Sequence, residues 1–333
     1  MNYDEYEQLL TELLDAFEKN KPDIPNRVMN KSIDDLLKAY AKAYNNLYKE
    51  VLLDFIENLG VSANPTQQDV IYLLTLMENR IKELNQQITA DVEKEIQKNY
   101  LAGNVLQHLA TESVTNVQQL KDSIPYVTLN QYTAEQLAQD TMEDLLFATQ
   151  NTERSLKKLV RNVFQKHLSL AGLEKTGQKE VAKRIKEELT KKGLSVSITK
   201  EGFVGIIDKA GRKWNLGTYV KMVTSTKMSQ AYHGGLKDKA VETGKDLAVI
   251  SKRGATDPCK YFEGIVISMT GATEGFMTYE QCKATGLIFH PNCRHTCYPV
   301  RSLDALHDDD VKHHAAQLKS MQKFVAAYKK SKK

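Results

Sequence analysis

Cysteine is missing from the first 258 of the 333 residues, and no apolar run approaches the roughly 20 residues of a membrane-spanning helix. The N-terminal segment MNYDEYEQLL is acidic and lacks the basic region and apolar stretch of a secretory signal. No stretch is rich in proline or in glycine and serine, and no internal repeat is present. These absences predict a protein without a membrane segment, which is made in a cytoplasm and is kept there or packaged from it.

Recognised enzyme motifs are also missing. The sequence has no glycine-rich phosphate loop and no metalloprotease helix motif. It has no recognised motif for reading DNA bases either. We therefore assign no catalytic residue and no organic cofactor from the sequence, and favour a protein that is not an enzyme.

Charge is distributed unevenly along the chain. Residues 1–150 contain 12 Lys and Arg against 24 Asp and Glu, a balance of −12, whereas residues 151–333 contain 34 against 18, a balance of +16. Such asymmetry is informative about binding partners rather than about the fold. It favours protein contacts for the acidic half and proximity to nucleic acid for the basic half, although solvated helices account for both charges equally well.

The first 165 residues are predicted to be helical. One helical face is formed by apolar residues at spacings of three and one: Tyr6, Leu9, Leu10, Leu13, Leu14 and Phe17. Residues 21–25 should break this helix, and Ser32 is a candidate N-cap for the next one. Further helices are expected from Asn64 to about Tyr100 and from Gln131 to His167.

The pattern changes near residue 170. A basic helix is expected over 178–192, followed by a small antiparallel meander of short strands between 194 and 216. A helix over 219–244 should be interrupted at Gly234 and Gly235. Strands are then expected over 248–251 and 264–268, and a final helix over 310–333. The sequence thus predicts an α+β protein, with a long helical domain over residues 1–170 and a smaller, basic, mixed domain with a short antiparallel sheet over 171–333.

The four cysteines, Cys259, Cys282, Cys293 and Cys297, lie in one short window together with His290 and His295. Thiolate and imidazole are preferred ligands of zinc. His290, Cys293, His295 and Cys297 are too close in sequence for all four to reach one ion easily. The better zinc site therefore combines Cys293 and one or both histidines with Cys259. A Cys259–Cys293 disulfide, or buried thiols with hydrogen-bonded histidines, are the alternatives, and each of them brings Cys259 and Cys293 together.

The most specific stretch is the segment from Gly286 to His295, which reads GLIFHPNCRH. It resembles the C-terminal signature of tailed-bacteriophage minor capsid proteins of the minor capsid protein 2 type, and more distantly that of Mu-type head morphogenesis proteins. Four other segments resemble the family in the same order: 217–222, 243–251, 257–264 and 267–271. The resemblance covers about residues 194–300. Ser225 departs from it, because the family pattern often has an arginine there.

This resemblance implies a structural minor capsid protein of a tailed phage, at low copy number in the interior of the phage head and assembled in the bacterial host cytoplasm. It implies association with the portal protein and with capsid components, and a part in head morphogenesis and in the packaging or delivery of DNA. With the charge split, it predicts that residues 1–170 contact the portal or capsid. The basic half would contact packaged DNA weakly and without sequence preference.

Two other functions are open from the sequence. Related head proteins sometimes carry a C-terminal effector enzyme, a nuclease or an ADP-ribosyltransferase. Its candidate residues here are His233, Glu263, His290, Arg294 and His295, with Cys293 as a thiolate nucleophile. We favour the structural role, because the same side chains are needed to hold an irregular loop. A dedicated DNA-binding protein is the other alternative, through the basic segments 175–192 and 319–333.

Overall fold

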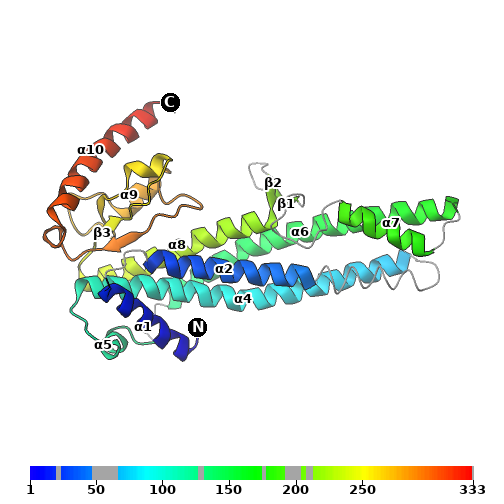
Figure 1. Ribbon diagram of the computed structural model, residues 1–333, viewed down its shortest axis with the longest axis horizontal. Coiled ribbons are helices and arrows are strands. Elements are labelled where there is room, and N and C mark those ends of the chain that lie inside the picture. Colours follow the sequence, from blue (N-terminus) through cyan, green and yellow to red (C-terminus); the bar gives the residue numbers. More distant parts are fainter. Residues whose placement is uncertain are drawn as a thin grey trace. The chain divides into compact units, whose positions relative to one another are not determined.

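The computed structural model describes residues 1–19, 24–46, 67–126, 131–174, 178–191, 204–207 and 213–331. Helices dominate the first part (Figure 1): α1 (Tyr3–Glu18), α2 (Ile24–Asn46), α4 (Gln67–Thr111), α5 (Val117–Ser123), α6 (Gln131–Glu174) and α7 (Gln178–Lys191). The later elements are β1 (Val204–Ile207), β2 (Lys213–Asn215), α8 (Leu216–Thr243), β3 (Leu247–Ile250), η2 (Pro258–Tyr261), β4 (Val266–Ser268), α9 (Tyr279–Ala284), β5 (Cys297–Pro299), η3 (Leu303–Ala305) and α10 (Asp308–Ser331). The predicted α+β class is confirmed. Among the described residues, no helix has both the length and the apolar character needed to cross a membrane.

Two compact units divide the chain, and each combines stretches that are far apart in sequence. Unit 1 consists of Met1–Ile33, Glu93–Gln139 and Thr224–Lys333, and unit 2 consists of Asp34–Val92 and Asp140–Val223. All four cysteines and the final α-helix belong to unit 1. The two strands β1 and β2 form an antiparallel pair in unit 2, as expected for residues 203–216. The strand expected over 194–198 lies outside the described residues.

Helix α1 follows the apolar pattern of its sequence. Asn2 caps it by accepting a hydrogen bond from the Glu5 N–H, and the Glu5 side chain accepts from the Asn2 N–H in return. Five residues of the predicted face are buried, and Phe17 at its end is half-buried: Tyr6, Leu9, Leu10, Leu13 and Leu14 are the buried ones. The Tyr6 hydroxyl donates to the Ile124 carbonyl just after α5 at 2.5 Å, which fixes α1 against the α5 segment.

Helix α2 begins earlier than expected, at Ile24. Pro25 fits there because the first turn of a helix needs no backbone N–H donor from that residue. The prediction that Ser32 is an N-cap is therefore wrong. Ser32 lies within the helix, where its buried hydroxyl donates to the Glu95 carboxylate of α4 and accepts from the Asn99 side chain.

Helix α8 continues through Gly234 and Gly235, so the predicted interruption is wrong. The reason is a close approach of α8 to α4. A Cβ atom on Gly235 would lie 1.9 Å from the Tyr100 carbonyl oxygen, and one on Gly103 would lie 1.9 Å from the Tyr232 carbonyl oxygen. Glycine at both places allows the two backbones to pack directly against each other. Tertiary contact thus offsets the low helix propensity of glycine.

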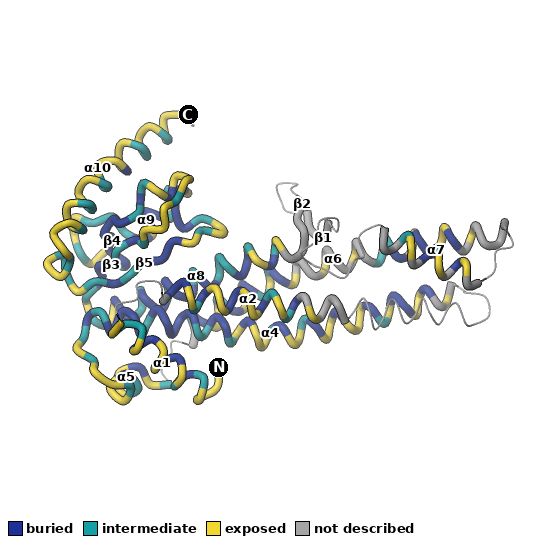
Figure 2. The backbone as a smooth tube through the Cα atoms, viewed as in Figure 1, coloured by how far each residue is buried: buried dark blue, intermediate teal, exposed yellow. Residues whose placement is uncertain are grey.

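A three-stranded antiparallel sheet with the order β4-β3-β5 forms the centre of the cysteine-containing region. Val249 of β3 is opposite Val266 of β4 and Tyr298 of β5. The sheet is mostly buried, whereas α10 keeps one long side exposed (Figure 2). The strands expected over 248–251 and 264–268 are confirmed, whereas β5 was not predicted. The buried Tyr232 hydroxyl donates to the Cys297 carbonyl at 2.8 Å and joins α8 to β5.

Candidate metal centre

Two short segments of unit 1 present the cysteine and histidine side chains. Cys259 lies in η2, where Asp257 caps the turn by accepting from the Cys259 N–H at 3.0 Å and Pro258 occupies the first position. His290, Cys293 and His295 lie on the loop that leads into β5. The fold places Cys259 beside this later loop, although 31 residues separate Cys259 from His290 in the sequence.

The later loop is held in an unusual backbone conformation. Phe289 and Asn292 have φ angles of 54° and 64°, in the left-handed region. Asparagine tolerates this region, but phenylalanine there costs about 1–2 kcal/mol. The Phe289 ring packs against the rings of Tyr279 and His233, with centroids 4.7 and 5.2 Å away. These contacts fix the strained turn immediately before His290.

The structure brings together the four residues that were selected from the sequence. The sulfurs of Cys259 and Cys293 lie 3.9 Å apart. The Cys259 sulfur lies 3.2 Å from His290 Nε2, and the Cys293 sulfur lies 3.4 Å from His295 Nδ1. Two overlapping sets have ligand atoms within 4.8 Å of one another: Cys259, Cys293 and His295, and Asp257, Cys259 and His290.

These separations fit the ligand set of a tetrahedral zinc ion. Zinc–sulfur bonds of about 2.3 Å and zinc–nitrogen bonds of about 2.0–2.1 Å place two sulfurs about 3.8 Å apart, and a sulfur and a nitrogen about 3.6 Å apart. The observed separations between neighbouring ligand atoms are 3.2, 3.4 and 3.9 Å. The donor types and these three separations suit zinc, but His290 forms a close set only with Asp257 and Cys259 and lies outside the set of Cys259, Cys293 and His295.

Each histidine turns one ring nitrogen toward a cysteine and has the other anchored to oxygen. His295 Nε2 lies 2.9 Å from a carboxylate oxygen of Glu263. That oxygen also accepts from the N–H groups of Arg253 and Ala255, at 2.9 and 3.0 Å. His290 Nδ1 lies 3.0 Å from the Pro291 carbonyl oxygen. Metal-binding histidines usually have such an outer partner, because it fixes the tautomer and the ring orientation.

Electrostatics favours one thiolate at this position. Burial opposes ionisation of Cys293, but hydrogen bonds from His295 outweigh it and lower the pKa of the thiol. Burial likewise opposes the charged form of His295, yet Cys293 and Glu263 raise its pKa. Burial raises the pKa of Cys259, which donates its thiol proton to the Leu287 carbonyl at 3.3 Å. Cys293 is therefore the cysteine that ionises more readily, whereas Cys259 loses its proton only when a further positive charge is nearby.

The other two cysteines lie outside both ligand sets. Cys282 is buried in α9, where burial raises its pKa to about 12. Cys297 is buried in β5, and its N–H donates to His233 Nε2 at 3.2 Å. His233 is itself buried, and desolvation lowers its pKa to about 3, so it is neutral. Arg294 is exposed on the rim of a depression of about 400 Å³ that opens onto the cluster.

Sequence reasoning did not identify the orienting role of Glu263 or the place of Asp257 beside the cluster. Glu263 was named only as a candidate for catalysis, whereas its carboxylate fixes His295 and two backbone N–H groups. Asp257 lies 3.8 Å from His290 Nε2 and joins the second ligand set. A carboxylate two residues before one cysteine was the available signal for Asp257. No spacing rule indicated that Glu263 returns to His295.

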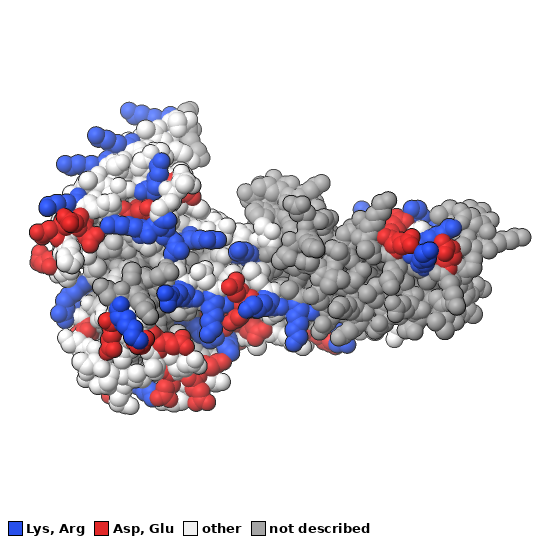
Figure 3. All heavy atoms as spheres, viewed as in Figure 1, with Lys and Arg blue, Asp and Glu red and all other residues white. Residues whose placement is uncertain are grey.

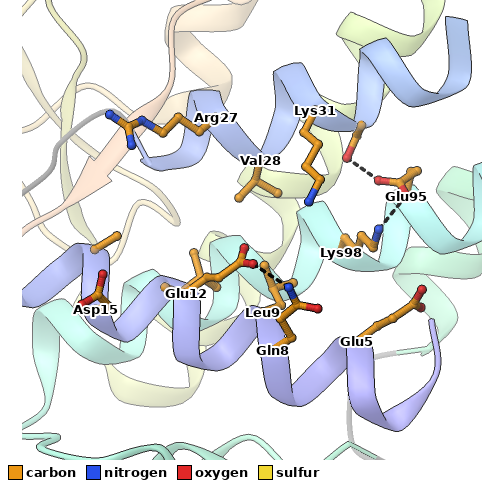
Figure 4. Close-up of a pocket in the computed structure, with 13 residues that line it drawn as sticks. Glu5, Gln8, Leu9, Glu12, Asp15, Arg27, Val28, Lys31, Glu95 and Lys98 are labelled. Carbon is orange, nitrogen blue, oxygen red and sulfur yellow. Dashed lines mark hydrogen bonds and ion pairs between the residues drawn. The ribbon is translucent and has the colours of Figure 1, made fainter. Parts of the chain in front are cut away.

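A second hollow of unit 1, of about 430 Å³, lies between α1 and α2 and over α4 (Figure 4). Leu9 and Val28 contribute apolar surface. Acidic side chains of α1, such as Glu12, are on one side, and Arg27 and Lys31 of α2 are on the other. The hollow contains no cysteine or histidine, so it differs in chemistry from the cluster around Cys259.

The family comparison extends the similarity to nearly the whole chain. A family model described as phage minor capsid protein 2 matches residues 28–333, so the match covers both the helical part and the Cys/His loop. No curated protein and no solved structure matches the chain. The match defines the class as a bacteriophage capsid component, and hence a virion protein. The chain belongs to the phage minor capsid protein 2 family.

Proposed function

We propose that this protein is a portal-associated component of the interior of a tailed-phage head, which acts in head morphogenesis and in the packaging or delivery of DNA. The family match over residues 28–333 supports this proposal most strongly. The charge balances of −12 over residues 1–150 and +16 over residues 151–333 suit a protein with one surface against other proteins and one near DNA. Assembly takes place in the host cytoplasm.

In this proposal, residues 1–170 provide contacts to the portal or capsid, and residues 171–333 provide the basic surface. The division concerns contacts along the sequence. It does not correspond to the compact units, because unit 1 includes both ends of the chain. The acidic contacts include exposed carboxylates of α1. Deletion of a whole half would remove parts of unit 1, so substitutions on the full chain are the better test.

The test counts full-length variants in purified phage heads. One variant neutralises three exposed acidic residues of α1: Asp4→Asn, Glu12→Gln and Glu18→Gln. A matched control neutralises three exposed acidic residues of the basic half: Glu274→Gln, Asp304→Asn and Asp309→Asn. We expect fewer copies per head for the first variant and a normal number for the control. Equal incorporation of both variants would show that α1 does not provide the protein contact.

We also propose that Cys259, His290, Cys293 and His295 bind one zinc ion. Four protein ligands leave no open position, which is the property of a structural zinc site. When bound, zinc would supply the positive charge that keeps both thiolates ionised, and it would join η2 to the loop that precedes β5. The support is the agreement of three interatomic distances with tetrahedral zinc and the outer partner of each histidine. Cys259, Cys293 and His295 already form one close set, and His290 would complete it by turning from Asp257 toward the ion.

Metal analysis of the purified protein tests this site. We expect one zinc per chain, lost together with thermal stability in Cys293→Ser and retained in Cys282→Ala, which changes a buried cysteine outside the cluster. Metal-free protein whose stability is unaffected by a chelator would refute the zinc site. If the unreduced protein has two fewer free thiols than the reduced protein, Cys259 and Cys293 form a disulfide instead.

One observation favours the alternative function of an effector enzyme. Cys293, His295 and Glu263 follow one another at 3.4 and 2.9 Å, in the order of a nucleophile, a base and an orienting carboxylate. Zinc binding and nucleophilic catalysis exclude each other here, because both need the Cys293 sulfur. Rapid alkylation of Cys293 by iodoacetamide in the protein as purified would support the enzyme. Slow alkylation that becomes rapid after a chelator is added would support the zinc site.

A further inference from the structure

The exposed side of α10 carries a regular row of positive charges. Lys312, Lys319, Lys323 and Lys330, here called the lysine stripe, all lie within about 20° of one line along the helix at about 100° per residue. All four are exposed. Figure 3 shows basic side chains along the outer edge of this helix. The stripe spans about five helical turns, or about 27 Å at about 1.5 Å per residue.

The opposite side of α10 is fixed to the rest of unit 1. Met321, which lies on the side away from the stripe, is buried. His314 Nδ1 accepts from the Val266 N–H of β4 at 3.0 Å, and the Gln317 side chain donates to the Lys260 carbonyl of η2 at 2.6 Å. The Phe324 ring stacks on Tyr261 with centroids 4.0 Å apart. The helix is therefore anchored from Asp310 to Phe324, which presents Lys312, Lys319 and Lys323 from a fixed support, and Lys330 lies on the turn beyond these contacts.

Lys312 lies one turn after Asp308 and Asp309, and the rest of the stripe has no acidic neighbours on its own helix. Asp308, Asp309 and Asp310 are at the N-terminus of α10, and residues 311–333 contain no acidic residue. Asp310 is paired with Lys252. No ion pair or hydrogen bond of the four lysines is present in the described part of the chain. The side chains between them on the exposed face are small or neutral: Ala315, Ala316, Ser320, Gln322, Ala326 and Ala327. A flat, strongly charged partner can therefore approach the helix closely.

We propose that the lysine stripe is the surface that binds the phosphate backbone of duplex DNA. This inference rests on the proposed function near packaged DNA and assigns the contact to one helix face. Duplex DNA has one phosphate charge per roughly 1.7 Å of helix axis over both strands, and a strand that passes along the stripe of about 27 Å brings several phosphates to it before it winds away. Flexible lysines can each reach one of these. Alanine and lysine offer no fixed pattern of donors and acceptors for base edges, so the binding has no sequence preference.

The experiment compares three full-length proteins on a short duplex of arbitrary sequence across a salt series. The stripe variant carries Lys312→Gln, Lys319→Gln, Lys323→Gln and Lys330→Gln. The control variant replaces four other exposed lysines: Lys31→Gln, Lys42→Gln, Lys82→Gln and Lys158→Gln. Both variants lower the net charge from +4 to 0, so they differ only in the position of the lost charges. A third variant with arginine at the four stripe positions keeps the charge and should bind like the wild type.

Four phosphate contacts contribute about −3.6 to the slope of log K against log salt, so between about 50 and 200 mM they weaken binding by about 150-fold. We expect the stripe variant to lose this part of the slope and the control variant to keep it. If the wild type binds DNA and both variants have the same slope of log K against log salt, the stripe is not the DNA-binding surface, and the proposed function is unaffected. Absence of wild-type binding would overturn both. Stripe-dependent binding to an acidic polypeptide but not to DNA would assign the stripe to a protein partner and also overturn the proposal.

Discussion

The carboxylate of Glu263 offers the most sensitive test of the candidate metal centre, because one oxygen has two separate tasks. It orients His295 from 2.9 Å, and it accepts from the backbone N–H groups of Arg253 and Ala255. Glu263→Gln keeps a carbonyl oxygen for the two N–H groups but removes the negative charge. Glu263→Ala removes both. The pair of variants therefore separates support of the metal ligand from support of the backbone.

The expected magnitudes follow from these contacts. Loss of an outer carboxylate partner lowers metal affinity by about 10–100-fold, equivalent to about 1.4–2.7 kcal/mol. For Glu263→Gln we expect this loss in zinc affinity, with less than about 1 kcal/mol of change in the unfolding free energy of metal-free protein, because the backbone acceptor is kept. Glu263→Ala should lose the same affinity and a further 1–3 kcal/mol, roughly, of metal-free stability, because the Ala255 N–H is partly buried without its acceptor.

Competition with a zinc-binding dye measures the affinity, and urea denaturation in the presence of a chelator measures the metal-free stability. Glu274→Gln, an exposed carboxylate outside the cluster, is the matched control and should change neither quantity. If Glu263→Gln binds zinc as tightly as the wild type, the carboxylate does not orient a metal ligand. A large metal-free destabilisation by Glu263→Gln would show that its charge, rather than its acceptor position, supports the backbone.

Two further predictions concern the interior of unit 1. Burial holds the pKa of His233 at about 3, below about 6.5 in the unfolded chain. Below about pH 6 the unfolded state therefore binds more protons than the folded state. We expect the unfolding free energy to drop there by up to about 1.4 kcal/mol per pH unit. His233→Gln, which keeps an acceptor for the Cys297 N–H, should flatten this slope in urea denaturation at several pH values, and an unchanged slope would exclude His233 as its source. Gly235→Ala should destabilise the protein by about 1–3 kcal/mol or more, because its Cβ meets the Tyr100 carbonyl at 1.9 Å. Gly234→Ala, whose Cβ meets nothing nearer than 3.8 Å, should be neutral or slightly stabilising, and equal effects of the two substitutions would contradict the close packing of α8 on α4.

Local sequence patterns were sufficient to predict the structure where a single helix or strand buries one face. The apolar stripe from Tyr6 to Leu14 has helical spacing, and those residues are buried in α1. The strand expected over 248–251 also appears as β3, with an apolar sequence and turn residues on both sides. The proximity of Cys259 and Cys293 followed from ligand chemistry, because four ligands on one short loop reach a single ion poorly.

Features that depend on distant partners were not predictable in this way. Gly234 and Gly235 carry a local signal for a helix break, and only the backbone of α4 explains why the helix continues. Ser32 has the residue type of an N-cap, but its hydroxyl is used by Glu95, which is 63 residues away. The short strand β5 has three residues and too little sequence for an alternating pattern. In each case the deciding contact lies outside the window that a periodic pattern covers.

The composition of unit 1 from the beginning, the middle and the end of the chain has a consequence for synthesis. A ribosome adds about 5–20 residues per second, so the 333 residues take roughly 20–70 s to emerge. For more than a third of that time, Gly103 of α4 has no Tyr232 to pack against, since α8 is made more than a hundred residues later. The sheet and α10 come later still. Unit 1 therefore completes its fold only when the chain is nearly finished, and prematurely ended chains expose the unpaired face of α4 to chaperones and proteases before they can enter a head.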